Sequence, residues 1–186
     1  MRLTLTVRVL ACALMTLSLV LPRGVRGEQG HAEYEVKAAF LYNFAALVQW
    51  PASAFSESGE PLAIAILGAA DFAPHTEEFL KDRKVGGRPI QVNRIASPKE
   101  ITGHHMVFVS AAENDRLARI LEVARGSQVL TIGESESFAR RGGIINFYRE
   151  GNKIRFEINR PAAEAAGLRI SSRLLRLARL VSGEGG

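Results

Sequence analysis

The stretch VLTIGESESFARRGGIINFYREGNKIRFEIN, residues 129–159, decides the class of fold. Its predicted elements are a strand over 127–132, a short helix over 135–141 and two β-rich segments over 144–149 and 153–159. The two β-rich segments are joined by Glu150-Gly151-Asn152. Because glycine adopts the backbone angles that tight turns require, this connection predicts an antiparallel hairpin.

Upstream of this stretch, strands and helices alternate. The run 61–68 is continuously apolar, as expected of a strand buried on both faces. The other predicted elements are strands over 88–92 and 105–110 and helices over 74–83 and 113–125. Such alternation is typical of a mostly parallel sheet with helices on both faces. The sequence therefore predicts an α/β fold, a single-domain three-layer α/β/α sandwich with an antiparallel hairpin near its C-terminal end.

Helices are also predicted at both ends of this domain. Residues 33–50 contain no glycine or proline and are apolar on two faces, which predicts a buried first helix that Pro51 ends. The C-terminal predictions are a helix over 161–166, ended by Gly167, and a last helix over 173–181, capped by Ser171 or Ser172.

Residues 1–27 have the pattern of a secretory signal peptide: a basic start, an apolar run over 9–21 and a small residue at the end. The apolar run has 13 residues, whereas a bilayer-spanning helix needs about 20. We therefore predict cleavage near Gly27, no stable membrane insertion and a single periplasmic domain over residues 28–186. The only cysteine, Cys12, lies in the leader, so the exported chain forms no disulfide.

The charge of the exported chain is nearly balanced. Four of the 24 basic residues lie in the leader, which leaves 20 basic against 19 acidic residues. Proteins that bind nucleic acid usually carry a concentrated basic patch. The composition therefore argues against a nucleic-acid partner.

The sequence contains no recognisable catalytic or cofactor motif. The nucleophile pattern G-x-S-x-G and the glycine-rich phosphate loops are missing, and Ser110 is interpreted as a strand end or helix cap. Glu134 and Glu136 lie at a predicted helix start, where the helix dipole explains acidic residues. His104 and His105 are adjacent on a strand and point to opposite faces, which argues against a shared metal. We expect no enzyme activity, no cofactor and no metal.

Polar residues that interrupt the apolar first helix are the first candidates for partner binding. These residues are Lys37, Tyr42, Asn43 and Trp50. If the helix supplies a binding surface, Tyr42, Asn43 and Trp50 should be partly accessible. Aromatic side chains such as Trp50 often dominate protein interfaces; the alternative is that Trp50 belongs to the core.

The last predicted helix carries a basic stripe of Arg173, Arg176 and Arg179. A solvated helix face explains such a stripe, and docking to an acidic protein surface or to lipid headgroups is the alternative. Arg173 stands apart because the helix dipole disfavours a cation in the first turn. We expect Arg173 to have a carboxylate partner, either Glu35 or Glu157 or a residue of a bound protein.

The ordered set of these segments resembles the YfiR family of periplasmic proteins over nearly the whole exported chain. The blocks that carry the resemblance are EYEVKAAFLYNFAALVQWP (33–51), GGRPIQV (86–92), HMVFVS (105–110), VLTIGESESFARRGGIINFYREGNKIRFEIN (129–159) and AGLRISSRLLRLARLV (166–181). The resemblance implies an exported binding protein that represses a membrane-bound diguanylate cyclase. Such a protein would lower cyclic di-GMP signalling and so affect biofilm formation and motility.

The partner implied by this resemblance is the periplasmic domain of an inner-membrane diguanylate cyclase. Family members often carry disulfides, so redox control does not transfer to a chain whose exported part lacks cysteine. The alternative function is a periplasmic small-molecule-binding sensory or uptake accessory domain, with a pocket at the carboxyl ends of the parallel strands. Whether the protein forms a homodimer stays open.

Overall fold

The computed structural model describes residues 25–183, and the chain divides into two units, residues 1–30 and residues 31–186. In the first unit, the described residues 25–30 are helical and begin α1 (Val25–Leu47). Most of the predicted leader therefore lies outside the described residues. Within the described part of the chain, no helix is long and apolar enough to cross a membrane.

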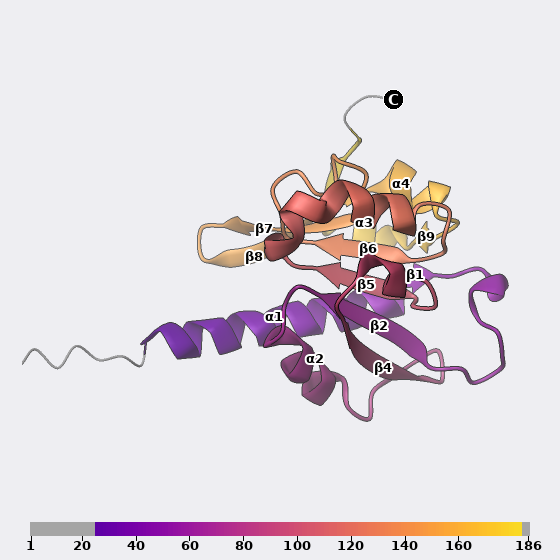
Figure 1. The fold of residues 1–186 in the computed structure, drawn as a ribbon, viewed down its shortest axis with the longest axis horizontal. Coiled ribbons are helices and arrows are strands. Elements are labelled where there is room, and N and C mark those ends of the chain that lie inside the picture. Colours follow the sequence, from indigo (N-terminus) through magenta and orange to yellow (C-terminus); the bar gives the residue numbers. More distant parts are fainter. Residues whose placement is uncertain (1–24, 184–186) are drawn as a thin grey trace, which may run out of the picture. The chain divides into compact units, whose positions relative to one another are not determined.

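An eight-stranded sheet forms the centre of the second unit, in the order β10-β8-β7-β6-β5-β2-β4-β3. The strands are β2 (Leu62–Leu67), β3 (Lys84–Val85), β4 (Arg88–Ile95), β5 (Met106–Val109), β6 (Leu130–Gly133), β7 (Ile145–Glu150), β8 (Lys153–Asn159) and β10 (Arg179–Val181). Five neighbouring pairs are parallel, and the β7–β8 and β3–β4 pairs are antiparallel. The mostly parallel sheet and its hairpin, visible in Figure 1, confirm the predicted fold class.

Two separate hydrophobic clusters cover the two faces of the sheet. Alternate residues of β2 point to opposite faces, so Ile64 and Ile66 join one cluster while Ala65 and Leu67 join the other. The first cluster includes residues of α1, α2 (Phe72–Leu80), α4 (Arg160–Ala165) and α5 (Ser172–Leu175). The second includes α3 (Leu117–Ala124). This arrangement is the predicted three-layer sandwich.

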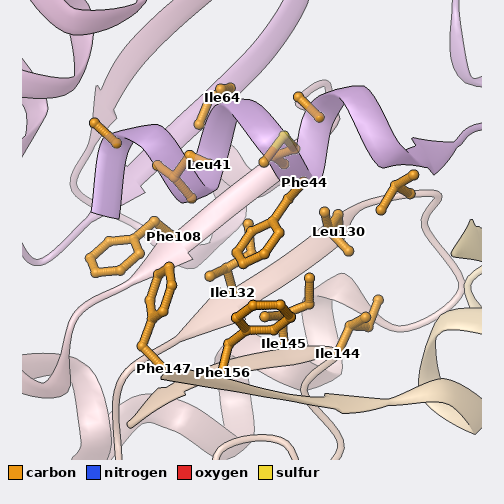
Figure 2. Close-up of a cluster of buried hydrophobic side chains, with 14 of the residues drawn as sticks. Leu41, Phe44, Ile64, Phe108, Leu130, Ile132, Ile144, Ile145, Phe147 and Phe156 are labelled. Atoms are coloured by element: carbon orange, nitrogen blue, oxygen red, sulfur yellow. The ribbon is translucent and has the colours of Figure 1, made fainter. Parts of the chain in front are cut away.

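Aromatic rings join α1 to the hairpin in the first cluster. Figure 2 shows Phe44 of α1 reaching toward Phe147 and Phe156, which come from β7 and β8. The ring centroids lie 5.7 Å and 5.1 Å from that of Phe44, distances typical of aromatic pairs. Phe44 is fully buried, so the helix predicted from its apolar faces is indeed covered by the sheet.

Three short 3₁₀ helices lie in the connections within residues 25–183: η1 (Ala52–Ala54), η2 (Pro98–Ile101) and η3 (Ala111–Arg116). Ser110 caps η3, because its side chain accepts a hydrogen bond from the backbone N–H of Ala112. The interpretation of Ser110 as a helix cap is confirmed.

The predicted helix over 135–141 is wrong. Residues 135–142 form turns, with Ser137 at a φ of 59°. The buried Phe138 ring fills the space beside Gly133 and Gly143, where a Cβ at either glycine would collide with it. Packing of this ring in the second cluster therefore decides the path of the segment, over its local helical pattern.

Both terminal helices also differ from prediction. α1 begins at Val25 rather than near Glu33, and it ends at Leu47 rather than at Pro51. The next residues form β1 (Val48–Gln49), which pairs antiparallel with β9 (Arg169–Ile170). Each of the two strands has only two residues, and the helical spacing of apolar residues in the sequence does not reveal this pairing.

The predicted last helix over 173–181 is wrong beyond its first turn. Ser171 caps α5 by accepting a hydrogen bond from the backbone N–H of Leu174, as expected, but α5 ends at Leu175. Arg179 then begins β10, which pairs in parallel with β8. The backbone hydrogen bonds of β8 favour this pairing over a longer helix, so the basic stripe does not exist.

Candidate functional site

Lys37 is the buried centre of an ion cluster at the carboxyl end of β6. Its Nζ lies 2.5 Å from a carboxylate oxygen of Glu33, one turn earlier in α1, and 2.5 Å from Glu134, which directly follows β6. Glu33 also pairs with Arg149 of the hairpin. Glu134 accepts a further hydrogen bond from the backbone N–H of Ala111. The cluster therefore ties α1 to the sheet.

The protonation states in this cluster follow from the pairing. Burial alone would lower the pKa of Lys37, but hydrogen bonds with Glu134 and Glu33 outweigh burial and raise it. Burial likewise tends to raise the pKa of Glu33, and the nearby Lys37 and Arg149 lower it overall. Lys37 thus stays charged and is paired within the protein. Glu134 belongs to this cluster rather than to a helix start, which corrects the earlier interpretation.

Tyr42 and Asn43 lie on the part of α1 nearest to β3, at one edge of the sheet. Tyr42 is half-buried, its hydroxyl donates to the backbone oxygen of Lys84 at 3.4 Å, and the Arg83 guanidinium lies 5.3 Å from the centre of its ring. Asn43 is exposed. These positions give the partial accessibility that the sequence predicts.

Trp50 lies near the amino ends of the parallel strands, away from Lys37. It is half-buried against the first cluster, and its Nε1–H donates to the backbone oxygen of His105 at 3.2 Å. Trp50 is therefore partly accessible and also contacts the core. This geometry agrees with both predictions for its side chain, as an interface residue and as a core residue.

His105 is held in its neutral form beside Trp50. Its Nδ1 accepts from the backbone N–H of Ala63 at 3.0 Å, and Nε2 lies 3.0 Å from the carbonyl oxygen of Ala54. A carbonyl only accepts, so the ring proton is on Nε2. The imidazole stacks on Phe55 and is 3% exposed. Burial lowers the pKa of His105 below its ordinary value.

This environment predicts an acid-sensitive stability. As the pH falls through the ordinary histidine range, near pH 6.5, the unfolded chain binds a proton at His105 more readily than the folded chain does, so the free energy of unfolding decreases. We expect urea denaturation at pH 7.5 and pH 5.5 to show a smaller loss in His105→Asn than in the wild type. An equal loss in His105→Asn and in the wild type would refute this role of His105.

Arg179, rather than Arg173, pairs with Glu157. The Nη2 and Nε atoms of Arg179 lie 2.5 Å and 3.1 Å from one carboxylate oxygen of Glu157, whose side chain is 3% exposed. The same guanidinium lies 4.1 Å from the centre of the Tyr148 ring. The hydrogen bond with Glu157 raises the pKa of Arg179. The candidate pairing of Glu157 with Arg173 is therefore wrong, because Arg179 is the partner of Glu157.

Arg173 is exposed on α5 and forms no ion pair with any other described residue. Exposed apolar side chains follow it closely: Leu177 is 65% exposed and Leu180 is 57% exposed. Among residues 30–183, whose burial the structure describes, Val36 on α1 is the remaining large apolar side chain that is exposed. We call residues 173–181 the C-terminal segment. The sequence did not predict that Leu177 and Leu180 are exposed, because a helix over 173–181 would orient their side chains differently.

The structure does not bring the five predicted binding residues together. Tyr42 lies near β3 at one edge of the sheet, whereas Arg173 precedes β10 at the other edge. Lys37 and Trp50 lie at opposite ends of the strands. No group of three or more histidine, cysteine or acidic side chains is arranged for a metal ion in the part of the chain that the structure describes.

These features define the class of protein: a small α/β/α sandwich in which Lys37 and Glu157 have internal ion partners and the C-terminal segment exposes apolar side chains. The model of the YfiR/HmsC-like family matches residues 34–179, and the chain belongs to this family. Membership places it in a regulatory family of periplasmic proteins associated with diguanylate cyclases. A search of curated proteins finds no match.

Proposed function

We propose that this protein represses a membrane-bound diguanylate cyclase by binding the periplasmic part of that enzyme through the C-terminal segment. Family membership is the observation that carries the proposal, since the family is tied to regulation of this enzyme class. The leader pattern supports a periplasmic location. Repression would lower cyclic di-GMP and so affect biofilm formation and motility.

The C-terminal segment has the features of a protein-binding surface. Leu177 and Leu180 expose apolar area, and Arg173 and Arg176, which lie a few residues away in the sequence, are also exposed. Exposed apolar side chains grouped with arginine are typical of interfaces. β10 is also an edge strand of the sheet, and edge strands offer backbone groups to a partner. The partner surface that fits is apolar with acidic residues around it.

A site-specific cross-linking experiment tests this proposal. A photoreactive amino acid is placed in the exported protein at position 180, at 43 or at 36, and cross-linked membrane proteins are identified by mass spectrometry. Position 180 should capture a protein with a diguanylate cyclase domain. Position 36 is the matched control, because Val36 is also an exposed apolar residue, and it should not. Capture mainly from position 43 would move the interface to the first helix.

Substitution at the same surface gives a quantitative prediction. Leu177→Glu combined with Leu180→Glu should weaken binding of the cyclase periplasmic domain by about 30-fold or more, the size typical of central interface residues. Val36→Glu should bind like the wild type, and the melting temperatures of all three proteins should agree. In the cross-linking experiment, capture of a transporter or an outer-membrane receptor instead of a cyclase would support the alternative uptake function.

A further inference from the structure

An open groove lies between α2 and β4, near the edge of the sheet opposite to β10. Its volume is about 840 Å³, and Figure 1 shows the two elements beside one another. One side of α2, residues 81–84 and the consecutive β4 residues 89–93 line it. Side chains of consecutive strand residues point to opposite faces of a sheet. A groove lined by all five of these β4 residues therefore runs along the backbone edge of the strand.

Most of this edge has no neighbouring strand among the described residues. β3 has two residues and pairs only with Arg88 and Pro89. The turn between β3 and β4 has a φ of 58° at Gly86 and 85° at Gly87. Two positive φ angles are typical of a two-residue hairpin turn, whose closing pair, here Val85 and Arg88, exchanges backbone hydrogen bonds. The backbone groups of Arg88 thus point toward β3 and away from β2.

Backbone groups of successive strand residues point to alternate edges. Those of Val92 and Arg94 therefore point to the same side as those of Arg88, beyond the end of β3. The residues between them direct their backbone groups to β2, with which β4 pairs in parallel. With no described strand beside them, Val92 and Arg94 offer N–H and C=O groups to an added strand.

An apolar floor accompanies this unpaired backbone. Ile90 and Val92 are half-buried and pack against the first hydrophobic cluster, on the face of the sheet that α2 covers. On the other face of β4, Gln91 is exposed. A strand added beside β4 would place every second side chain over the apolar floor. Such a strand should therefore carry an apolar residue at every second position.

The charges of the groove set a direction for this strand. α2 follows the carboxyl end of β2 and leads back to the amino end of β4, so the residues after α2 adjoin that amino end. Three basic residues and one acidic residue lie there: Lys81, Asp82, Arg83 and Lys84. Earlier in α2, Glu77 and Glu78 line the groove. All six are exposed, and none forms an ion pair with another described residue.

We propose that the groove binds an extended segment of a partner protein, which joins the sheet as a strand antiparallel to β4. In that orientation the carboxyl end of the segment lies at the amino end of β4, beside Lys81 and Lys84. The segment that fits has alternating apolar residues, basic residues at its start and acidic residues at its end. The backbone edge supplies affinity, and the floor and charges supply selectivity. This surface is apart from the C-terminal segment and does not rest on the proposed function.

An NMR titration of the exported protein tests the proposal with a synthetic peptide of alternating valine and threonine that begins with two lysines and ends with two aspartates. A peptide of the same composition, with the two charged ends exchanged, is the control. The first peptide should produce saturable shifts at the amides of residues 90–94 and should slow hydrogen exchange at residues 92 and 94. The control peptide should bind at least about tenfold more weakly.

Two charge-reversal variants distinguish the groove from the rest of the surface. Lys81→Glu combined with Lys84→Glu should weaken binding of the first peptide by about tenfold or more. Arg125→Glu combined with Lys153→Glu reverses two exposed basic residues outside the groove and should bind like the wild type. Because all four side chains are exposed, the amide spectra of both variants should show the wild-type fold.

Three results would overturn the proposal. The first is the absence of saturable shifts with the first peptide up to about 2 mM. The second is unchanged hydrogen exchange at residues 92 and 94 when the peptide is saturating, and the third is equal binding of the peptide by the two double variants. Slow exchange at residues 92 and 94 without peptide, lost on dilution, would also overturn it, because a second copy of this chain would then occupy the edge.

Discussion

Phe44→Ala is expected to lower the free energy of unfolding by about 3–5 kcal/mol, the cost typical of removing a buried phenylalanine. Phe44 is fully buried on α1, and its ring contacts the rings of Phe40, Phe147 and Phe156. Alanine would remove these aromatic contacts and leave a cavity between α1 and the hairpin. The surroundings should close little of that cavity, because α1 is tied to the sheet through the Lys37–Glu134 pair and is followed directly by the β1–β9 pairing.

Urea denaturation of the wild type, Phe44→Ala and Val36→Ala measures this effect. Val36 lies on the same helix but is 43% exposed. Its replacement should therefore change the free energy of unfolding by no more than about 0.5 kcal/mol. A loss below about 1 kcal/mol for Phe44→Ala would show that α1 does not pack on the hairpin as described.

Arg179→Ala is expected to cost about 2 kcal/mol, since it leaves the buried carboxylate of Glu157 without its cation. A fully buried pair typically costs more, about 3–5 kcal/mol, but the Arg179 side chain is 53% exposed and solvent screens part of the interaction. This expectation differs from the one based on the basic stripe, in which Arg179 was an ordinary surface residue.

Arg176→Ala is the matched control, because Arg176 is an exposed arginine only three residues earlier in the sequence. The free energy of unfolding of this variant should stay within about 0.5 kcal/mol of the wild-type value. Combining Arg179→Ala with Glu157→Gln should recover part of the loss, since glutamine carries no uncompensated charge. Thermal and urea denaturation of the four proteins distinguish these outcomes. Equal, small effects of the two arginine substitutions would show that the Glu157 pair contributes little.

The sequence predicts the fold well where local pattern and tertiary packing agree. Apolar runs identified β2 and β5, and the two β-rich segments around Gly151 identified the hairpin. It failed where long-range contacts decide the conformation. The turns at 135–142 depend on the packing of Phe138 against two glycines, and β10 depends on a free edge of β8. Neither contact is encoded in local periodicity.

The candidate site was predictable only in part. The sequence identified Lys37 as a candidate because it is a charged residue within an apolar helix. Glu33 lies four residues before it, at the spacing of a helical ion pair. Its second partner, Glu134, is 97 residues away in the sequence, and no local pattern pairs it with Lys37.

The intracellular concentration of cyclic di-GMP tests the proposed repression most directly. It is measured in cells that lack this gene and in the same cells carrying the wild type, Val36→Glu or the Leu177→Glu/Leu180→Glu double variant, all exported at equal levels. We predict that loss of the gene raises the concentration, that the wild type and Val36→Glu restore it, and that the double variant does not. An unchanged concentration after loss of the gene, or full restoration by the double variant, would contradict repression through the C-terminal segment.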